Sequence, residues 1–187
     1  MRRLIVTENI TVDGIISPLG DWFDPGADDE ELAAVNARNG ADADALVLGR
    51  VTYEEFAGFW PHQEGEISAY LDQVSKYVVS TGLEQADWQN TTILRDLDGI
   101  AALKRQPGRD ITVTGSTTLV RSLIPTGLVD LFRLFVHPVV QGHGVRLFDE
   151  VALPLSKPTV TGFPSGVVLL EYAPRLEHAP RLEYAPR

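Results

Sequence analysis

Two glycine-containing segments of this sequence have the composition of anion-binding turns. In the first, Gly49, Arg50 and Thr52 follow the short apolar run at residues 45–48 and open a helix-like segment. A strand that leads into a helix N-terminus presents free backbone N–H groups and the positive end of the helix dipole, which attract phosphate. Gly49 lets a ligand approach the backbone closely, and Arg50 adds a fixed positive charge. The alternative for this first junction is an ordinary turn that binds nothing.

The second segment, ITVTGSTTL at residues 111–119, has the same layout. Its glycine permits close approach, and its hydroxyl side chains can cap a helix or donate hydrogen bonds to phosphate. An ordinary Ser/Thr N-cap is the alternative here. The residues that form this second junction are Thr114, Gly115, Ser116, Thr117 and Thr118.

Neither junction contains GxGxxG or GxxxxGK[ST], so the sequence predicts neither a Rossmann nucleotide site nor a P-loop. In an open parallel sheet, however, ligands bind at the carboxyl ends of the strands. Two glycine-containing junctions at two such ends therefore predict a clamp for a diphosphate.

The elements that must position these junctions alternate along the chain. Short apolar runs predict strands, and the segments between them predict helices that begin with acidic residues or end at Pro and Gly. This alternation is typical of a parallel sheet covered on both faces, and a closing hairpin around residues 164–166 makes the sheet mixed. Pro138 indicates a bulge or an edge position in the last long strand. Strands are expected at residues 4–10, 45–48, 76–80, 91–94, 111–114, 131–140, 159–163 and 167–172, and helices at residues 28–38, 52–59, 67–74, 98–105 and 117–124.

The bulk composition narrows the function further. The 187 residues, 44% hydrophobic and 22% charged, indicate one globular domain. A formal net charge of −10 without a Lys/Arg cluster argues against a nucleic-acid or anionic-membrane partner. The absence of Cys excludes disulfides, thiolate catalysis and Cys-based zinc sites, and His137 and His143 have no evident third partner for a metal. Because no signal-peptide pattern is present and no apolar run reaches roughly 18 residues, a cytoplasmic protein is expected.

The C-terminus repeats a six-residue unit. LEYAPR, LEHAPR and LEYAPR follow one another from residue 170 to residue 187. A Pro in every unit prevents a regular helix or a central strand, so we divide the chain into a domain at residues 1–172 and a tail at residues 173–187. A duplicated tail without chemistry and an arm that docks on a neighbouring subunit are the two alternatives.

The chain resembles the dihydrofolate-reductase-like family in an ordered set of segments: TVDGII, LGRVTYEEFAGFWP, KYVVS and ITVTGSTTLVRSLIPTGLVDLFRLFVHPVVQGHGVRLF. More closely, it resembles the C-terminal reductase domain of bacterial bifunctional riboflavin-biosynthesis deaminase-reductases, in a stand-alone form. The resemblance extends over about residues 2–172. It implies a three-layer α/β/α fold with a mixed, mostly parallel sheet and a C-terminal antiparallel hairpin, NADPH as the hydride donor, and a homodimer.

The resemblance also assigns roles to individual positions. It implies that both junctions hold the cofactor phosphates, with the second junction beside the nicotinamide end. It places Ser80 and Thr81 near the adenosine ribose and its 2′-phosphate. It places Asp13 and Gly14 in a loop that borders the nicotinamide and the substrate.

Dihydrofolate reductases carry a substrate-binding carboxylate on the first helix. In this chain Asp28 and Glu31 lie in the corresponding acidic stretch, downstream of Trp22, which is a candidate wall of an aromatic substrate slot. With Asp13 they are the predicted catalytic residues, because one carboxyl can bind a pterin-like ring and assist its protonation. The alternative is that these acids solvate a helix N-terminus and favour its dipole. Riboflavin-pathway reductases carry an acidic residue directly before the glycine of the second junction, where this chain has Thr114.

Together these features predict an NADPH-dependent reductase that transfers a hydride to a small flat heterocycle, a pterin or an aminopyrimidine. The nicotinamide supplies the hydride, and the protein supplies binding and orientation. A non-catalytic protein of the same fold that binds a nucleotide or a flavin is the alternative.

Overall fold

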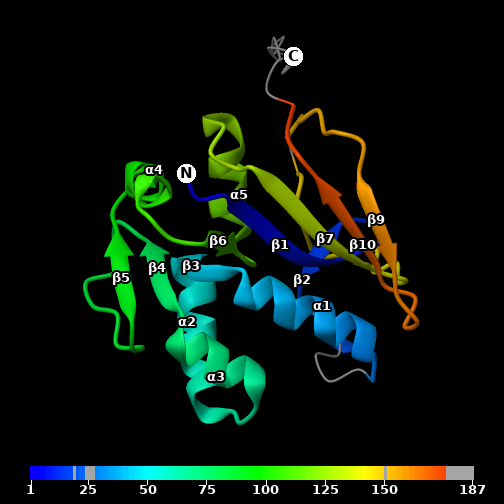
Figure 1. The fold of residues 1–187 in the computed structure, drawn as a ribbon, viewed down its shortest axis with the longest axis horizontal. Coiled ribbons are helices and arrows are strands. Elements are labelled where there is room, and N and C mark those ends of the chain that lie inside the picture. Colours follow the sequence, from blue (N-terminus) through cyan, green and yellow to red (C-terminus); the bar gives the residue numbers. More distant parts are fainter. Residues whose placement is uncertain (19, 24–27, 150, 176–187) are drawn as a thin grey trace.

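An eight-stranded mixed sheet lies at the centre of the molecule (Figure 1). The computed structural model describes residues 1–18, 20–23, 28–149 and 151–175, so most of the predicted tail, residues 176–187, lies outside the described residues. The strands are β1 (Leu4–Thr11), β3 (Ala43–Gly49), β4 (Ser75–Val79), β5 (Thr91–Leu94), β6 (Asp110–Val113), β7 (Leu131–His137), β9 (Thr159–Gly162) and β10 (Val168–Tyr172). Their order is β5-β4-β3-β6-β1-β7-β10-β9, and every pairing is parallel except β7 with β10 and β10 with β9.

Helices cover both faces of this sheet, so the predicted three-layer fold with its C-terminal hairpin is confirmed. On one face lie α4 (Leu97–Arg105) and α5 (Thr117–Leu123). On the other lie α1 (Glu30–Ala41), α2 (Arg50–Phe59) and α3 (Glu66–Gln73). Among the described residues, no helix is long and apolar enough to span a membrane. Short 3-10 turns occur at Gly20–Trp22, Trp60–His62 and Ile124–Thr126.

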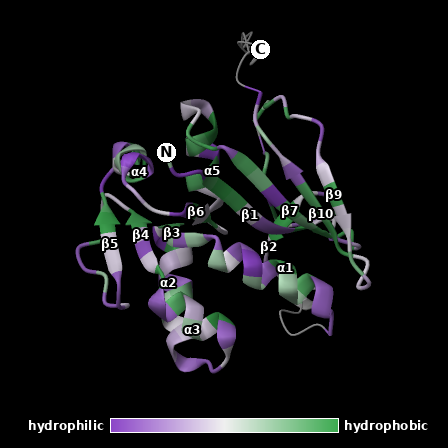
Figure 2. Cartoon of the chain, in the orientation of Figure 1, coloured by the Kyte–Doolittle hydropathy of each residue, from purple (hydrophilic) through white to green (hydrophobic). Residues whose placement is uncertain are grey.

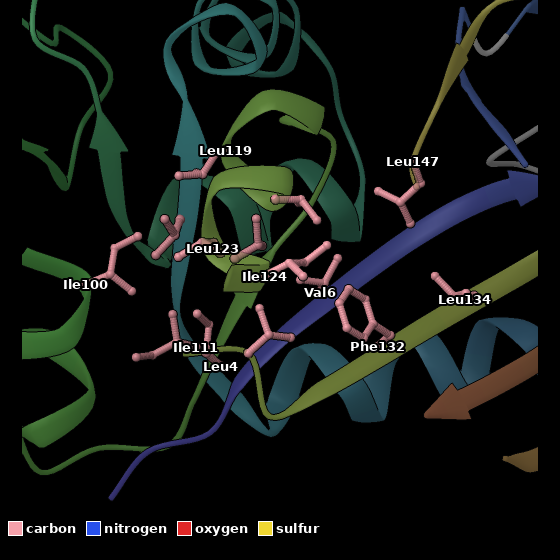
Figure 3. Close-up of a cluster of buried hydrophobic side chains, with 14 of the residues drawn as sticks. Leu4, Val6, Ile100, Ile111, Leu119, Leu123, Ile124, Phe132, Leu134 and Leu147 are labelled. Atoms are coloured by element: carbon pink, nitrogen blue, oxygen red, sulfur yellow. The ribbon is translucent and has the colours of Figure 1, made fainter. Parts of the chain in front are cut away.

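The apolar core under α4 and α5 is formed by alternating side chains of the central strands (Figure 3). Leu4 and Val6 of β1 and Ile111 of β6 are completely buried there, beneath Ile100 of α4 and Leu123 of α5. Burying one side chain of this size stabilises the fold by about 1.5–3 kcal/mol. Figure 2 shows apolar residues concentrated in the central strands, whereas the helices that cover the sheet mix hydrophilic and apolar residues.

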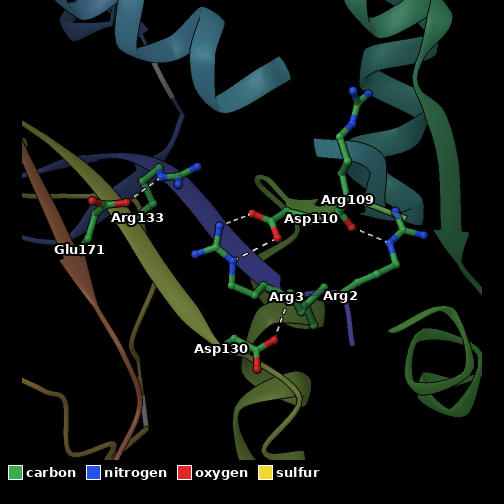
Figure 4. Close-up of polar contacts among 8 residues, drawn as sticks. Arg2, Arg3, Arg109, Asp110, Asp130, Arg133 and Glu171 are labelled. Atoms are coloured by element: carbon green, nitrogen blue, oxygen red, sulfur yellow. Dashed lines mark hydrogen bonds and ion pairs between the residues drawn. The ribbon is translucent and has the colours of Figure 1, made fainter. Parts of the chain in front are cut away.

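Ion pairs tie the amino ends of the strands together (Figure 4). Arg3 pairs with Asp110 at the start of β6, with its Nε 3.0 Å from Oδ1. Arg2 pairs with Asp44 of β3 and donates through Nε to the backbone oxygen of Arg109 at 2.7 Å. The charges at this end of the sheet are therefore paired with one another, whereas both predicted junctions lie at the opposite, carboxyl end.

The structure differs from the sequence predictions at two places. β7 ends at His137, directly before Pro138, and lies between β1 and β10. The predicted strand at residues 131–140 is confirmed as far as His137. The bulge or edge expected at Pro138 is wrong, because a residue without an N–H ends the pairing instead. The second difference is a small sheet of β2 (Ile15–Ser17) and β8 (Val145–Arg146), whose strands are too short to show a periodic pattern.

Candidate functional site

The two junctions predicted from the sequence lie against each other at the carboxyl ends of β3 and β6. The backbone N–H of Gly49 donates to Ser116 Oγ at 2.8 Å. The backbone N–H of Ser116 donates to Thr52 Oγ1 at 3.0 Å. Each junction therefore supplies a side-chain acceptor to the backbone of the other, and the two form one unit.

The second junction requires glycine at one position. Gly115 and Ser116 are both left-handed, with φ of 57° and 54°. A Cβ on Gly115 would lie 3.0 Å from Cγ2 and 3.2 Å from Oγ1 of Thr52, closer than ordinary contact. Gly49 differs, because its φ is −77° and a Cβ there would meet Ser116 at an ordinary 3.5 Å. The contact between the two junctions therefore requires glycine at residue 115 but not at residue 49.

The helices that follow the junctions begin without side-chain caps. Gly49 is the N-cap residue of α2 and has no side chain to offer, and Ser116 is the N-cap residue of α5 but uses its Oγ to accept from Gly49. Thr117 is half-buried and Thr118 exposed. The expected capping of α5 by these hydroxyls is not observed. Two adjoining helix starts therefore keep N–H groups that can bind an anion.

Arg50 provides a positive charge at the start of α2. Its Nη1 lies 2.9 and 2.7 Å from the two carboxylate oxygens of Glu54, and both side chains are about half exposed (50% and 47%). Exposed pairs with this i,i+4 spacing contribute only about 0.3–0.5 kcal/mol. A phosphate can therefore replace Glu54 as the partner of Arg50 with little loss.

A second cation, which the sequence reasoning missed, lies beside Ser80 and Thr81. Arg95 directly follows β5 and is exposed, and its Nη1 donates to the backbone oxygens of Ser80 at 3.1 Å and Leu83 at 2.7 Å. The Oγ of Ser80 accepts from the N–H groups of Gly82 and Leu83, at 3.3 and 3.0 Å. The sequence signal that could have indicated this site was Arg95 itself, a single arginine directly after a predicted strand.

A buried glutamate lies beneath the second junction. Glu8 of β1 is only 4% exposed, and its Oε2 accepts from the backbone N–H of Gly115 at 3.0 Å. Its Oε1 is buried and has no hydrogen-bond partner among the residues that the structure describes. Burial raises the pKa of the Glu8 carboxyl well above its usual value, and the Gly115 N–H opposes this rise only in part. A carboxyl that stays neutral here does not repel an anion at the junction.

On the opposite face of the sheet, the central strands carry polar side chains. Thr7 and Asn9 of β1 and Thr112 of β6 are only half-buried, although both strands have neighbours on each side. Because side chains alternate along a strand, they point away from the core that buries Leu4 and Val6. Central parallel strands are usually apolar on both faces. These partly exposed polar side chains form a surface, here called the ligand face, that is a candidate position for a flat molecule.

Aromatic rings border the ligand face at the end of β7. His137 contacts Trp22 and Phe23 edge to face, at ring-centroid distances of 5.3 and 5.7 Å. Its Nε2 lies 2.9 Å from Oδ1 of Asn9. Burial lowers the pKa of His137, so the ring is neutral at neutral pH. Trp22 thus lies beside the polar surface, as its candidate role in a substrate slot requires.

Asp13 connects the loops at the edge of this region. Its Oδ1 accepts from Thr11 Oγ1 at 2.6 Å and from the N–H of Gln141 at 3.1 Å, and its Oδ2 accepts from the N–H of Gly142 at 2.7 Å. These hydrogen bonds, led by that from Thr11, lower the pKa of Asp13 to about 2. Gly14 follows with a φ of 83°. As a carboxylate, Asp13 therefore holds the loop after β1 against the loop at residues 141–142. Its role as a proton donor stays a prediction, and these contacts do not favour it.

The other two predicted catalytic carboxyls, Asp28 and Glu31, are exposed at the start of α1. The neighbouring Asp29 caps this helix, with Oδ1 accepting from Leu32 N at 3.0 Å and Oδ2 from Ser165 N at 2.9 Å. Acidic residues in a first turn stabilise the helix dipole, which is the alternative role for this stretch. A substrate role for Asp28 or Glu31 stays a prediction without a supporting contact.

A hollow of about 670 Å³ lies elsewhere, between α2 and residues 83–89. Tyr53, Trp88 and Asp72 are among its lining residues, and none of the predicted cofactor or catalytic residues lines it. We assign it no part in the site.

Comparison with known proteins agrees with this architecture. The chain matches the family model described as the RibD C-terminal domain over residues 2–169. Two uncharacterized proteins of Bacillus subtilis (strain 168) are similar in sequence. YyaP is 31% identical over 182 residues, which cover 91% of this chain and 94% of YyaP. YwjB is 26% identical over 159 residues, which cover 80% of this chain and 84% of YwjB.

Three solved structures share the fold. A putative riboflavin biosynthesis protein from Shewanella sp. PV-4 has a TM-score of 0.69 at 20% identity, covering 92% of this chain and 99% of that one. A pyrimidine reductase-like protein from Corynebacterium diphtheriae has a TM-score of 0.65 at 14% identity, covering 93% and 92%. Dihydrofolate reductase from Enterococcus faecalis, in complex with NADP(H), has a TM-score of 0.62 at 16% identity, covering 92% and 96%.

The strand order, the antiparallel hairpin and these neighbours define a protein of the dihydrofolate-reductase-like fold. The match over nearly the whole chain is the more specific finding. The chain belongs to the RibD C-terminal domain family, as the resemblance of its segments predicted.

Proposed function

We propose that this protein is an NADPH-dependent reductase that transfers a hydride to a small flat heterocycle of the pterin or aminopyrimidine type. The observation that carries the proposal is the interlocked pair of junctions beside the polar ligand face. Membership of the RibD C-terminal domain family and the fold shared with a dihydrofolate reductase support an oxidoreductase. The NADP(H) in the Enterococcus faecalis complex supports a nicotinamide cofactor.

The residues of the two junctions fit the phosphates of such a cofactor. The uncapped N–H groups of α2 and α5, together with Arg50, would bind the diphosphate. The exposed guanidinium of Arg95, beside Ser80 and Thr81, would bind the 2′-phosphate. Thr114 and Gly14 would border the nicotinamide, which supplies the hydride when bound.

The raised pKa of Glu8 favours the neutral acid, which would support cofactor binding. A carboxylate directly behind the Gly115 N–H would repel the diphosphate, whereas the protonated acid only accepts a hydrogen bond. The proton that the substrate needs has a different source. Because Asp13 is already hydrogen-bonded and Asp28 and Glu31 are exposed, we propose that a water molecule delivers it.

Calorimetry with NADPH tests the cofactor assignment. Arg50→Ala should weaken binding strongly, because it removes the charge at the first junction, and Gly115→Val should abolish it, because the side chain would displace Thr52. Glu55→Gln, an exposed carboxyl on α2, is the matched control and should bind as the wild type does. Unchanged NADPH affinity in both junction variants would show that the clamp is misassigned.

A non-catalytic binding protein of the same fold is the second candidate. The exposure of Asp28 and Glu31 favours it, since neither offers a protected acid to the ligand face. Loss of NADPH absorbance on addition of pterins or aminopyrimidines decides between the two. A protein that binds NADPH tightly and oxidises it with none of them is the binding protein.

The homodimer implied by the resemblance stays a prediction. Sedimentation of the full chain measures the subunit number. Removal of residues 176–187 then shows whether the repeat tail contributes to assembly.

A further inference from the structure

The ligand face contains one polar pair whose geometry can select a substrate. Asn9 lies on the strand between β6 and β7, where a parallel sheet normally carries apolar, covered residues. It is nevertheless half-buried, and so is Thr7 two residues earlier on the same face. Thr7 Oγ1 is buried and has no hydrogen-bond partner among the described residues. The Thr7 hydroxyl is too deeply buried to meet a ligand directly, whereas the partly exposed Asn9 amide can hydrogen-bond to a ligand on this face.

His137 fixes the orientation of the Asn9 amide. Its Nε2 lies 2.9 Å from Asn9 Oδ1, and its ring is held edge-on by Trp22 and Phe23. The neutral imidazole has one N–H, and when Nε2 carries it this N–H donates to Oδ1. The amide oxygen is then occupied. The amide NH₂ has no protein partner among the residues that the structure describes, so it is left as a donor at the ligand face.

We propose that Asn9, held by the His137 side chain, recognises a ring carbonyl oxygen of the substrate by donating an N–H hydrogen bond to it. The proposal rests on the proposed reductase function and narrows its substrate class to oxo-substituted pyrimidines or pterins. Trp22 and Phe23 border the same position and suit a flat ring. A ring that presents an amino group there places donor against donor and is rejected, because neither group is then paired.

Two probes separate these cases: a diaminopyrimidinone and a triaminopyrimidine. The first has a ring carbonyl beside a ring N–H, and the second has an amino group beside an unprotonated ring nitrogen. Calorimetric titrations of both are made with and without NADPH. The wild type should prefer the pyrimidinone by about tenfold, the factor expected for one net hydrogen bond. Asn9→Asp replaces the donor by an acceptor and should reverse the preference. His137→Phe keeps an aromatic ring but frees the amide to rotate, so the preference should fall towards one.

Asn36→Asp is the matched control, because it makes the same exchange at an exposed position of α1 and should leave the preference unchanged. Circular dichroism melting confirms that each variant folds. An unchanged preference in Asn9→Asp, or binding of neither probe to the wild type, overturns the proposal. The NADPH affinity measured alongside separates it from the reductase assignment: a wild type that fails to bind NADPH refutes that assignment, while the titrations without NADPH still decide the role of Asn9.

Discussion

The Glu8 carboxyl should make the protein less stable as the pH rises, and Glu8→Gln should remove this effect. In the unfolded chain a glutamate ionises near its usual pKa of 4.5. In the folded protein, burial raises the pKa of Glu8 well above that value. Above the usual pKa the folded state therefore holds one proton more than the unfolded state. Each such proton lowers the free energy of unfolding by about 1.4 kcal/mol per pH unit, until the folded carboxyl ionises too.

Glutamine preserves the shape of this side chain and can still accept from the Gly115 N–H, but it does not titrate. Exchanging the carboxyl for an amide changes stability by an amount that does not depend on pH, so the pH slope is the informative quantity. We expect the free energy of unfolding of the E8Q variant, relative to the wild type, to rise by about 1.4 kcal/mol for each unit between about pH 5 and the pH at which folded Glu8 ionises.

Urea unfolding at a series of pH values measures this slope. Glu55→Gln is the control, because an exposed carboxyl has no comparable difference between folded and unfolded states. NADPH titrations over the same series give a second reading, since a bound diphosphate beside Glu8 disfavours its ionisation. The wild type should lose affinity as the pH rises through the pKa of folded Glu8, and the E8Q variant should not. Parallel stability profiles for the wild type and the E8Q variant would refute the reasoning that Glu8 is neutral in the folded protein.

Three further predictions concern the loops around the site. Gly115→Ala should reduce the free energy of unfolding by about 1–2 kcal/mol from the left-handed backbone alone, and by more because of the contact with Thr52. Gly49→Ala should reduce it much less. Similar losses in both variants would contradict the inference that only residue 115 requires glycine. Arg95→Gln should weaken NADPH binding by about tenfold or more, as for a lost charge-assisted hydrogen bond, while NADH binding changes little; an equal loss for both cofactors would remove Arg95 from the 2′-phosphate site. Asp13→Asn should destabilise the protein at neutral pH. This difference from the wild type should vanish as the pH falls towards the lowered pKa of about 2, because the wild-type carboxylate is protonated there. A difference in stability that persists at acid pH would show that the Asp13 carboxylate does not stabilise the loops.

The sequence predicted the layers of this fold because short apolar runs alternate regularly with helix-like segments that have clear start and stop residues. The junction at residues 114–118 was placed correctly after a strand and before a helix for the same reason. The hydrogen bonds between Gly49, Ser116 and Thr52 were beyond prediction, because they join segments more than sixty residues apart and depend on β3 and β6 being neighbours.

Two residues with proposed roles stand out in the pattern of β1. Glu8 interrupts the alternation of Leu4, Val6 and Ile10 on one face of β1, which marks it as a buried acid rather than a surface one. Asn9 lies on the other face of β1, which has a strand on each side, and a polar residue is unusual on a central parallel strand. The roles of the acids at the start of α1 were harder to predict, because a shift of one residue decides which side chain caps the helix and which faces solvent.

The hydrogen bonds between the junctions do not compete with their proposed role in binding. A hydroxyl has one donor and two acceptor lone pairs. Thr52 Oγ1 accepts from Ser116 N and Ser116 Oγ accepts from Gly49 N, so each hydroxyl still has its own proton to donate. A phosphate can therefore bind to the same two side chains that hold the junctions together. Because the same hydroxyls would serve both purposes, binding of the anion should stabilise the contact between β3 and β6, and loss of either hydroxyl should weaken cofactor affinity and stability together.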